Sequence, residues 1–137
     1  MVIMASMVYN QDITLDDSDK TFTVPAGKCW RLQFLQGQLA TTATAGNRQM
    51  AVIIGDGTNT VWYKLFGSTQ AASLIRRYYA SVNLPDDVAF DSAGGIRMGM
   101  LDWVIPAGWT VRLYDAAAIA PAADDLEYRL MVEEFVP

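Results

Sequence analysis

Hydrophobic and polar residues alternate along much of the chain with a period of two, the pattern of half-buried β-strands whose hydrophobic positions face a core. Trp30, Leu32 and Phe34 form one such set, separated by polar residues. The run at 126–133 is the clearest, because three of its alternate positions carry charges that a one-residue slip of register would place in the core. Further runs lie at 50–54 and 110–113, and at 61–65 Val61, Tyr63 and Leu65 alternate with Trp62 and Lys64.

Turn residues separate these predicted strands. Residues 55–59, Gly-Asp-Gly-Thr-Asn, predict a hairpin, because Gly and Asn tolerate the positive φ that such turns need. The segment 71–79 fits either one helical turn or the start of a strand, and 116–125 fits a long Ala-rich loop or a short helix. Residues 83–91 predict a loop. No amphipathic helix of about 10–15 residues is available for parallel crossovers, so we expect antiparallel strands.

A count of about seven or eight strands is typical of a sandwich or barrel. Two similar tetrapeptides, Val-Pro-Ala-Gly at 24–27 and Ile-Pro-Ala-Gly at 105–108, each precede a strand. They are either two similar type I turns, with Pro second and Gly fourth, or marks of two related Greek-key halves. We expect an all-β, antiparallel β-sandwich, jelly-roll-like with about eight strands, over residues 21–137, preceded by an N-terminal arm of residues 1–20.

Composition and charge narrow the range of partners. At 137 residues the chain fits one domain, and 52% of it is hydrophobic while only 18% is charged, against about 25% in a typical domain. We therefore expect part of the apolar surface to meet a partner. The net charge is −5 and the ten Lys and Arg residues are scattered, which argues against nucleic-acid binding. No apolar run approaches the roughly 20 residues that span a membrane, so we expect no membrane partner.

The usual equipment for catalysis is scarce. Histidine is absent, so neither a serine triad nor a typical metal site can be assembled, and Cys29 has no histidine to activate it. We interpret Cys29 as a buried structural thiol. A carboxylate pair could still perform hydrolysis, but the Asp pairs lie in predicted loops. We expect no enzyme activity, no catalytic or metal-binding residues and no cofactor.

Large aromatic and arginine side chains are the best candidates for contacts with other proteins, since both types are enriched in interfaces. The tryptophans also fit a sugar-stacking face, although core and interface positions are commoner for this residue. The candidate interface residues are Trp30, Arg31, Arg76, Arg77, Trp103, Trp109 and Arg112.

Five segments carry a likeness to known proteins: 25–32, 39–49, the Val-Ile strand that ends in Gly-Asp-Gly at 55–57, 105–108 and 126–130. Together they resemble small virion proteins encoded in phage and prophage structural modules, of the capsid decoration (cement) or head or tail fibre type. The resemblance covers about 22–135 and consists of β-turn and strand signatures, not catalytic motifs. It implies a jelly-roll-like domain, and no site residue carries over from it.

From this resemblance we expect a virion structural protein that binds the outer capsid surface and stabilises the head. Its expected partners are the major capsid protein and copies of itself, as a homotrimer on the capsid surface after synthesis in the host cytoplasm. The N-terminal arm would order on a neighbouring subunit, or else be a frayed terminus. The alternatives are a tail or fibre component that binds host glycan, and a small hydrolase or isomerase on a jelly roll.

Overall fold

The computed structural model describes residues 5–137, which form ten β-strands in two sheets and contain no helix. Each sheet presents one face to the other, and the hydrophobic core lies between them. The strands are β1 (Ala5–Asp12), β2 (Asp19–Thr23), β3 (Cys29–Ala40), β4 (Met50–Gly55), β5 (Thr60–Leu65), β6 (Ile75–Ser81), β7 (Gly95–Gly99), β8 (Val104–Ile105), β9 (Thr110–Asp115) and β10 (Asp125–Phe135).

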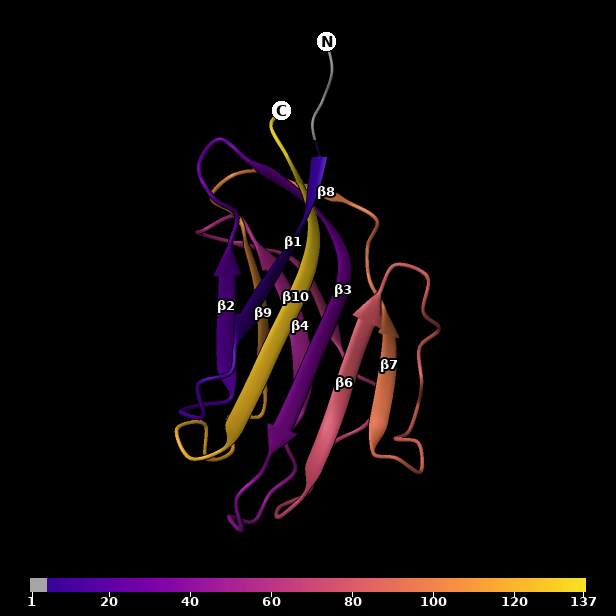
Figure 1. The fold of residues 1–137 in the computed structure, drawn as a ribbon. Helices are drawn as coiled ribbons and strands as arrows, with labels where there is room; N and C mark the ends of the chain where they lie inside the picture. Colours follow the sequence, from indigo (N-terminus) through magenta and orange to yellow (C-terminus); the bar gives the residue numbers. More distant parts are fainter. Residues whose placement is uncertain (1–4) are drawn as a thin grey trace.

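The strand order is that of a jelly roll. Strand β4 pairs with β5, β3 with β6, β2 with β9 and β1 with β10, as if one long hairpin were closed at β4 and β5. Wrapping this hairpin around a core gives sheets of order β1-β10-β3-β6-β7 and β2-β9-β4-β5, with the front sheet of Figure 1 being the first. The expected jelly-roll-like β-sandwich is confirmed. The count exceeds about eight because β7 and the short β8, which pairs with β3, join the first sheet.

One pair of strands is parallel, which the sequence did not predict. Strands β6 and β7 run in the same direction, and the chain returns between them through the loop 82–94 instead of a helix. The ambiguous segment 71–79 proves to be a turn followed by the start of β6, and 116–124 is a loop made of turns. The predicted hairpin at 55–59 is confirmed between β4 and β5.

A β-bulge in β3 changes which side chains face the core. Opposite β10 the register shifts between residues 131 and 132, so that Gln33 is an extra residue in β3. Leu32 lies in the core, but Phe34 then points outward and is 37% exposed, while Leu35 is fully buried. The alternation had placed Phe34 in the core, and the bulge explains why that was wrong.

Strand β5 is also turned relative to the expected pattern. Val61, Tyr63 and Leu65 lie on the outer face, whereas Trp62 packs against the core. Because β5 is an edge strand of the four-stranded sheet, no further strand covers the side of these outward side chains that faces away from β4. The expectation that these three residues face the core was therefore wrong.

The hydroxyl groups of two buried tyrosines form hydrogen bonds within the chain. The Tyr78 hydroxyl donates to Gln70 Oε1 at 2.8 Å, and the Tyr128 hydroxyl donates to the Val111 carbonyl at 3.2 Å. Burial raises the pKa of both tyrosines above the usual value, so both stay neutral donors at ordinary pH. Neither buried ring therefore leaves its polar tip without a partner.

The two similar tetrapeptides form matching turns that lie next to each other. In each, the nitrogen two residues beyond the alanine donates to the proline carbonyl at 3.2 Å, and Gly27 and Gly108 have φ of 74° and 84°. Proline is thus first and glycine third, as in a type II turn, which corrects the expected type I assignment. The Gly108 nitrogen donates to the Val24 carbonyl at 3.0 Å, so the two turns support each other.

Residues 5–12 form β1, which is an edge strand of the six-stranded sheet and pairs with β10 over its whole length. The boundary between an arm of residues 1–20 and a domain of 21–137 stays a prediction, and residues 1–4 lie outside the described residues. Within residues 5–137 no helix has the length and apolar character needed to cross a membrane.

Candidate protein-binding surface

Two open hollows on the surface contain paired polar groups. One has a volume of about 430 Å³ and lies beside Trp62 and Leu101. In it, Lys64 Nζ lies 2.9 Å from the Asp86 carboxylate and donates to the Gly99 carbonyl at 3.1 Å. The hydrogen bond from Lys64, and then the one from the Gly99 N–H, hold the pKa of Asp86 below its usual value. This carboxylate is therefore ionised and paired near neutral pH.

A second hollow, of about 300 Å³, lies between β3 and the loops that follow β6 and β7. Arg31 lines it, with Nε 3.5 Å from the Asp102 carboxylate, and Glu133 lies opposite Arg31 in the strand register. No group of three or more Asp, Glu or Cys side chains within residues 5–137 is placed to hold a metal ion.

The tryptophans among the candidate interface residues separate into buried and exposed ones. Trp30 is 2% exposed, and its indole N–H donates to Glu134 Oε2 at 2.8 Å, so it belongs to the core and is removed from the candidate interface. Trp103 is 40% exposed and meets the half-buried Trp109 edge to face, with ring centres 5.9 Å apart. Of these three, Trp103 offers a partner the most contact area.

The candidate arginines lie on different faces of the sandwich. Arg77 is exposed on β6, and the neighbouring Arg76 guanidinium lies 5.4 Å from the Phe90 ring centre. On the outer face of the other sheet, Arg112 lies 3.9 Å from the Tyr114 ring centre, and its Nη2 is 2.5 Å from a carboxylate oxygen of Asp19. Two of these three guanidinium groups already have a partner within the chain. The seven candidates therefore do not form one site.

Another set of side chains, which the sequence did not point to, does form a continuous surface. On the outer face of the six-stranded sheet, Tyr9 lies opposite Met131, and Met131 lies opposite Phe34. The Phe34 ring stacks against Tyr79 with centres 6.1 Å apart, and Met7 precedes Tyr9 on the same face of β1. We name these five residues the apolar belt. It crosses β1, β10, β3 and β6 from the sheet edge inward.

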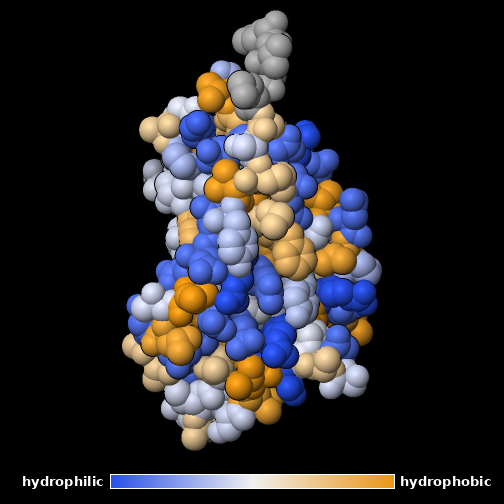
Figure 2. Space-filling model, in the orientation of Figure 1, coloured by the Kyte–Doolittle hydropathy of each residue, from blue (hydrophilic) through white to orange (hydrophobic). Residues whose placement is uncertain are grey.

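The apolar belt is well exposed for residues of its type. Met7 and Tyr9 are 58% and 54% exposed, and Phe34 and Met131 are 37% and 38% exposed. Figure 2 shows hydrophobic side chains gathered over the upper parts of β10 and β3 on this face, with hydrophilic side chains below them. A contiguous exposed apolar surface of this kind marks an interaction site more often than single exposed residues do.

Charges of opposite sign lie on the two sides of the apolar belt. Glu133 and Arg129 flank Met131 on β10, and all three point outward. Within residues 5–137, Glu133 has no ion-pair partner within 4.0 Å, and Arg129 has only Glu127, at 3.6 Å. The belt therefore separates an acidic position from a basic one.

A smaller apolar surface lies on the opposite outer face. Val61, Tyr63 and Leu65 are between 37% and 46% exposed along β5, and we name them the β5 patch. Ile53 of β4 lies opposite Tyr63 in the register. The sandwich thus carries apolar side chains on both of its outer faces, separate from the buried core between the sheets.

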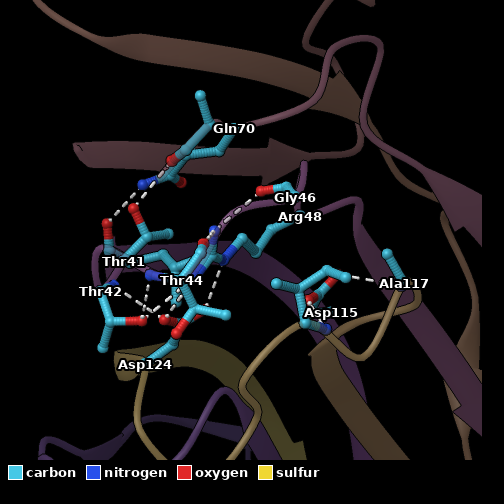
Figure 3. Close-up of polar contacts among 12 residues, drawn as sticks. Thr41, Thr42, Thr44, Gly46, Arg48, Gln70, Asp115, Ala117 and Asp124 are labelled. Carbon is cyan, nitrogen blue, oxygen red and sulfur yellow. Dashed lines mark hydrogen bonds and ion pairs between the residues drawn. The ribbon is translucent and has the colours of Figure 1, made fainter. Parts of the chain in front are cut away.

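A buried polar network holds the loops at one end of the sandwich (Figure 3). Arg48 and Asp124 are both fully buried, with Nε 2.7 Å from Oδ2 and Nη2 3.0 Å from Oδ1. Arg48 Nη1 also donates to the carbonyls of Thr44 and Gly46, and Nη2 to the Thr42 hydroxyl. Asp124 also accepts from the Thr42 N–H at 2.9 Å. Both members of this ion pair are therefore satisfied by further hydrogen bonds, as a buried pair requires.

A second buried carboxylate completes this end of the sandwich. Asp115 accepts backbone N–H groups of Gln49, Ala117 and Ile119 at 2.8 to 3.0 Å. Together the two networks join the loop between β3 and β4 to the loop between β9 and β10. We interpret them as structural, because their polar groups are directed at the chain itself.

Comparisons with known proteins add little beyond the fold. No protein-family model and no curated protein sequence matches the chain. A structure of Desmodium yellow mottle tymovirus is similar over 100% of this chain and 90% of its own, with 11% identity and a TM-score of 0.36. The tobacco streak virus coat protein is similar over 96% and 88%, with 12% identity and a TM-score of 0.35. Dimeric latent PorU from Porphyromonas gingivalis matches 99% of this chain and 13% of its own, with 10% identity and a TM-score of 0.46.

Proposed function

We propose that the protein is a structural component of a larger assembly and acts by binding other protein surfaces. The observation that carries this proposal is the exposure of apolar side chains on both outer faces of the sandwich, in the apolar belt and the β5 patch. A protein with two such faces can contact two partners at once, as a component of an assembly must. The proposal includes no catalytic step.

Within that class, we propose a bacteriophage virion protein of the decoration or cement type. It would bind the outer surface of the capsid, with the major capsid protein as its partner, and stabilise the head by bridging neighbouring subunits. The resemblance of its turn and strand segments to small phage virion proteins supports this choice. Several weak contacts, repeated over a symmetric particle, raise the effective concentration of each further contact.

The β5 patch is the surface that we assign to the capsid. Its three apolar side chains form a row along an edge strand, and an edge can approach a neighbouring protein closely. Apolar residues of this kind contribute to binding by excluding water from the contacts at the centre of an interface. The net charge of −5 makes a basic or neutral capsid surface the better partner.

Co-sedimentation with empty heads of the phage that carries this gene tests the proposal. We expect the wild-type protein to pellet with the heads, and Tyr63→Lys with Leu65→Lys to reduce the bound fraction at least about tenfold, because two charges enter an apolar contact. Ile75→Lys is the matched control, since Ile75 is 56% exposed at the start of β6, outside both surfaces and outside the predicted arm. Failure of the wild-type protein to bind heads would refute the decoration role.

A second candidate function rests on Trp103. Its indole is 40% exposed and is supported edge-on by Trp109, an arrangement that suits stacking on a sugar ring. Under this alternative the protein is a tail or fibre component that recognises host glycan. A glycan array is expected to give a ligand whose binding disappears in Trp103→Ala, and an array without any ligand would refute it.

A further inference from the structure

We propose that the apolar belt is the contact between two copies of this chain, related by a two-fold axis that runs along the belt. This inference deepens the proposed function, on which it rests, by naming the partner of one face. It leaves the β5 patch, on the opposite side of the sandwich, free to contact a capsid. The shape of the belt and the charges beside it both favour a second copy.

The shape of the surface suits another sheet. The belt lies on four adjacent strands. Tyr9, Met131 and Phe34 occupy successive register positions across β1, β10 and β3 and form a ridge transverse to the strands. Tyr79 on β6 lies opposite Gln36 in the register and extends the ridge through its ring contact with Phe34. Two sheets pack face to face at about 10 Å with their strands nearly aligned, and their side chains interdigitate. With the axis along the row of Tyr9, Met131 and Phe34, each of these side chains meets the same row of the second copy.

Charge favours a second copy over an arbitrary partner. The proposed two-fold axis lies in the plane between the two sheets and runs along the belt, across the strands. Rotation about this axis brings the Glu133 side of Met131 in one copy over the Arg129 side in the other, so Glu133 of each copy faces Arg129 of its partner. The symmetry repeats this contact, which gives two complementary ion pairs for one apolar contact. The single Glu127 near Arg129, at 3.6 Å, leaves the guanidinium available for a second carboxylate. Glu133 lies opposite Arg31 in the register, but no basic nitrogen of the described residues lies within 4.0 Å of its carboxylate, so Arg129 of the second copy would be its first ion-pair partner among them.

This contact differs from the homotrimer that the sequence led us to expect. A two-fold contact uses the same surface on both copies, whereas a closed trimer joins two different surfaces. The two arrangements predict different masses and different responses to substitution. The trimer stays a prediction that the same experiment examines.

Sedimentation equilibrium of the full chain, without capsids, tests the proposal. At roughly micromolar to millimolar concentration we expect a mass twice the 15.1 kDa of the chain. Glu133→Arg alone and Arg129→Glu alone each create two like-charge contacts, and each is expected to weaken the dimer about tenfold or more. Circular dichroism of each variant establishes that the sandwich is still folded.

Mixing the two variants gives the decisive measurement. In a mixed dimer, the arginine introduced at position 133 of one variant faces the glutamate introduced at position 129 of the other. The unchanged Arg129 of the first variant faces the unchanged Glu133 of the second, so both contacts become attractive again. We expect the mixture to dimerise although neither variant does so alone. Met131→Lys should abolish the dimer, while Tyr63→Lys, on the opposite face, should leave it unchanged.

Three results would overturn the inference: a wild-type monomer throughout this range, a trimer indifferent to these charges, or a mixture as weakly associated as its components. If the wild-type chain is monomeric and Met131→Lys loses binding to empty heads, the belt binds the capsid, so the self-contact fails while the proposed function stands. If dimers form and heads are not bound, the proposed function fails while the self-contact stands.

Discussion

Removing the carboxylate of Asp124 should destabilise the protein more than removal of any surface ion pair. The change Asp124→Ala leaves the fully buried Arg48 guanidinium without the only carboxylate that pairs with it among residues 5–137. It also removes the acceptor of the Thr42 N–H. The buried positive charge must then be hydrated by opening the loops at this end of the sandwich, or be tolerated in a low-dielectric site.

The magnitude follows from the burial of both partners. Breaking a buried ion pair by removing one partner costs about 3–5 kcal/mol, because an uncompensated charge stays behind. For a domain of this size that corresponds to a midpoint of thermal unfolding lower by roughly 10–15 °C. Arg97→Ala is the matched control: its ion pair with Asp87 has 51% of the arginine side chain exposed, and such pairs contribute about 0–1 kcal/mol.

Thermal and urea unfolding, followed by circular dichroism, measure both variants. A double variant, Arg48→Met with Asp124→Leu, should regain part of the lost stability, because an apolar pair carries no charge. It should not regain all of it, since the carbonyls of Thr44 and Gly46 lose their donors. If Asp124→Ala costs no more than Arg97→Ala, the buried pair does not hold these loops and the reasoning is wrong.

Three further predictions concern the core and the surface. Gly37→Ala should cost about 1–3 kcal/mol, measured by urea unfolding, because an added Cβ would lie 2.5 Å from a leucine methyl of the facing sheet. Tyr78→Phe should cost about 1–3 kcal/mol in the same assay, because the Gln70 side-chain oxygen loses its buried donor. The hydrogen bond from Lys64 lowers the pKa of Asp86 in the folded protein. The ionised Asp86 carboxylate therefore stabilises the fold fully at pH values above its pKa in the unfolded chain, about 3.9, and this stabilisation is lost as the pH falls through its lower pKa in the folded protein. The stability difference between wild type and Asp86→Asn should therefore shrink toward zero in acid, and a difference that is constant with pH would contradict this.

Sequence patterns predicted the strands well because alternation reflects which side chains can share a buried face. The run from 126 to 133 alternates in the structure as it does in the sequence, with Tyr128 and Leu130 buried and Met131 exposed. The same rule failed in β3 and β5. In β3 a bulge adds one residue, and in β5 the hydrophobic row lies outside, so that Phe34 and Tyr63 were assigned to the wrong face.

Contacts between segments that are distant in the sequence could not be predicted from local sequence patterns. Arg48 follows a Gly-Asn turn and Asp124 belongs to one of several aspartate pairs, and nothing in either neighbourhood indicates that they meet. The apolar belt was missed for a related reason, since it gathers residues from four strands whose order depends on the whole topology. Trp30 was the reverse case: its residue type suggested an interface, but its place on β3 buries it.

The extra residue in β3 has an evolutionary consequence. Side chains after Gln33 lie on the face opposite to the one that an uninterrupted strand would give them. Deleting that single codon would remove the bulge and keep Phe34 outward and Leu35 inward, because Phe34 would then follow Leu32 directly in regular alternation. The bulge thus absorbs one inserted residue locally, so that a lineage can gain or lose this residue and still keep the same side chains on the exposed face.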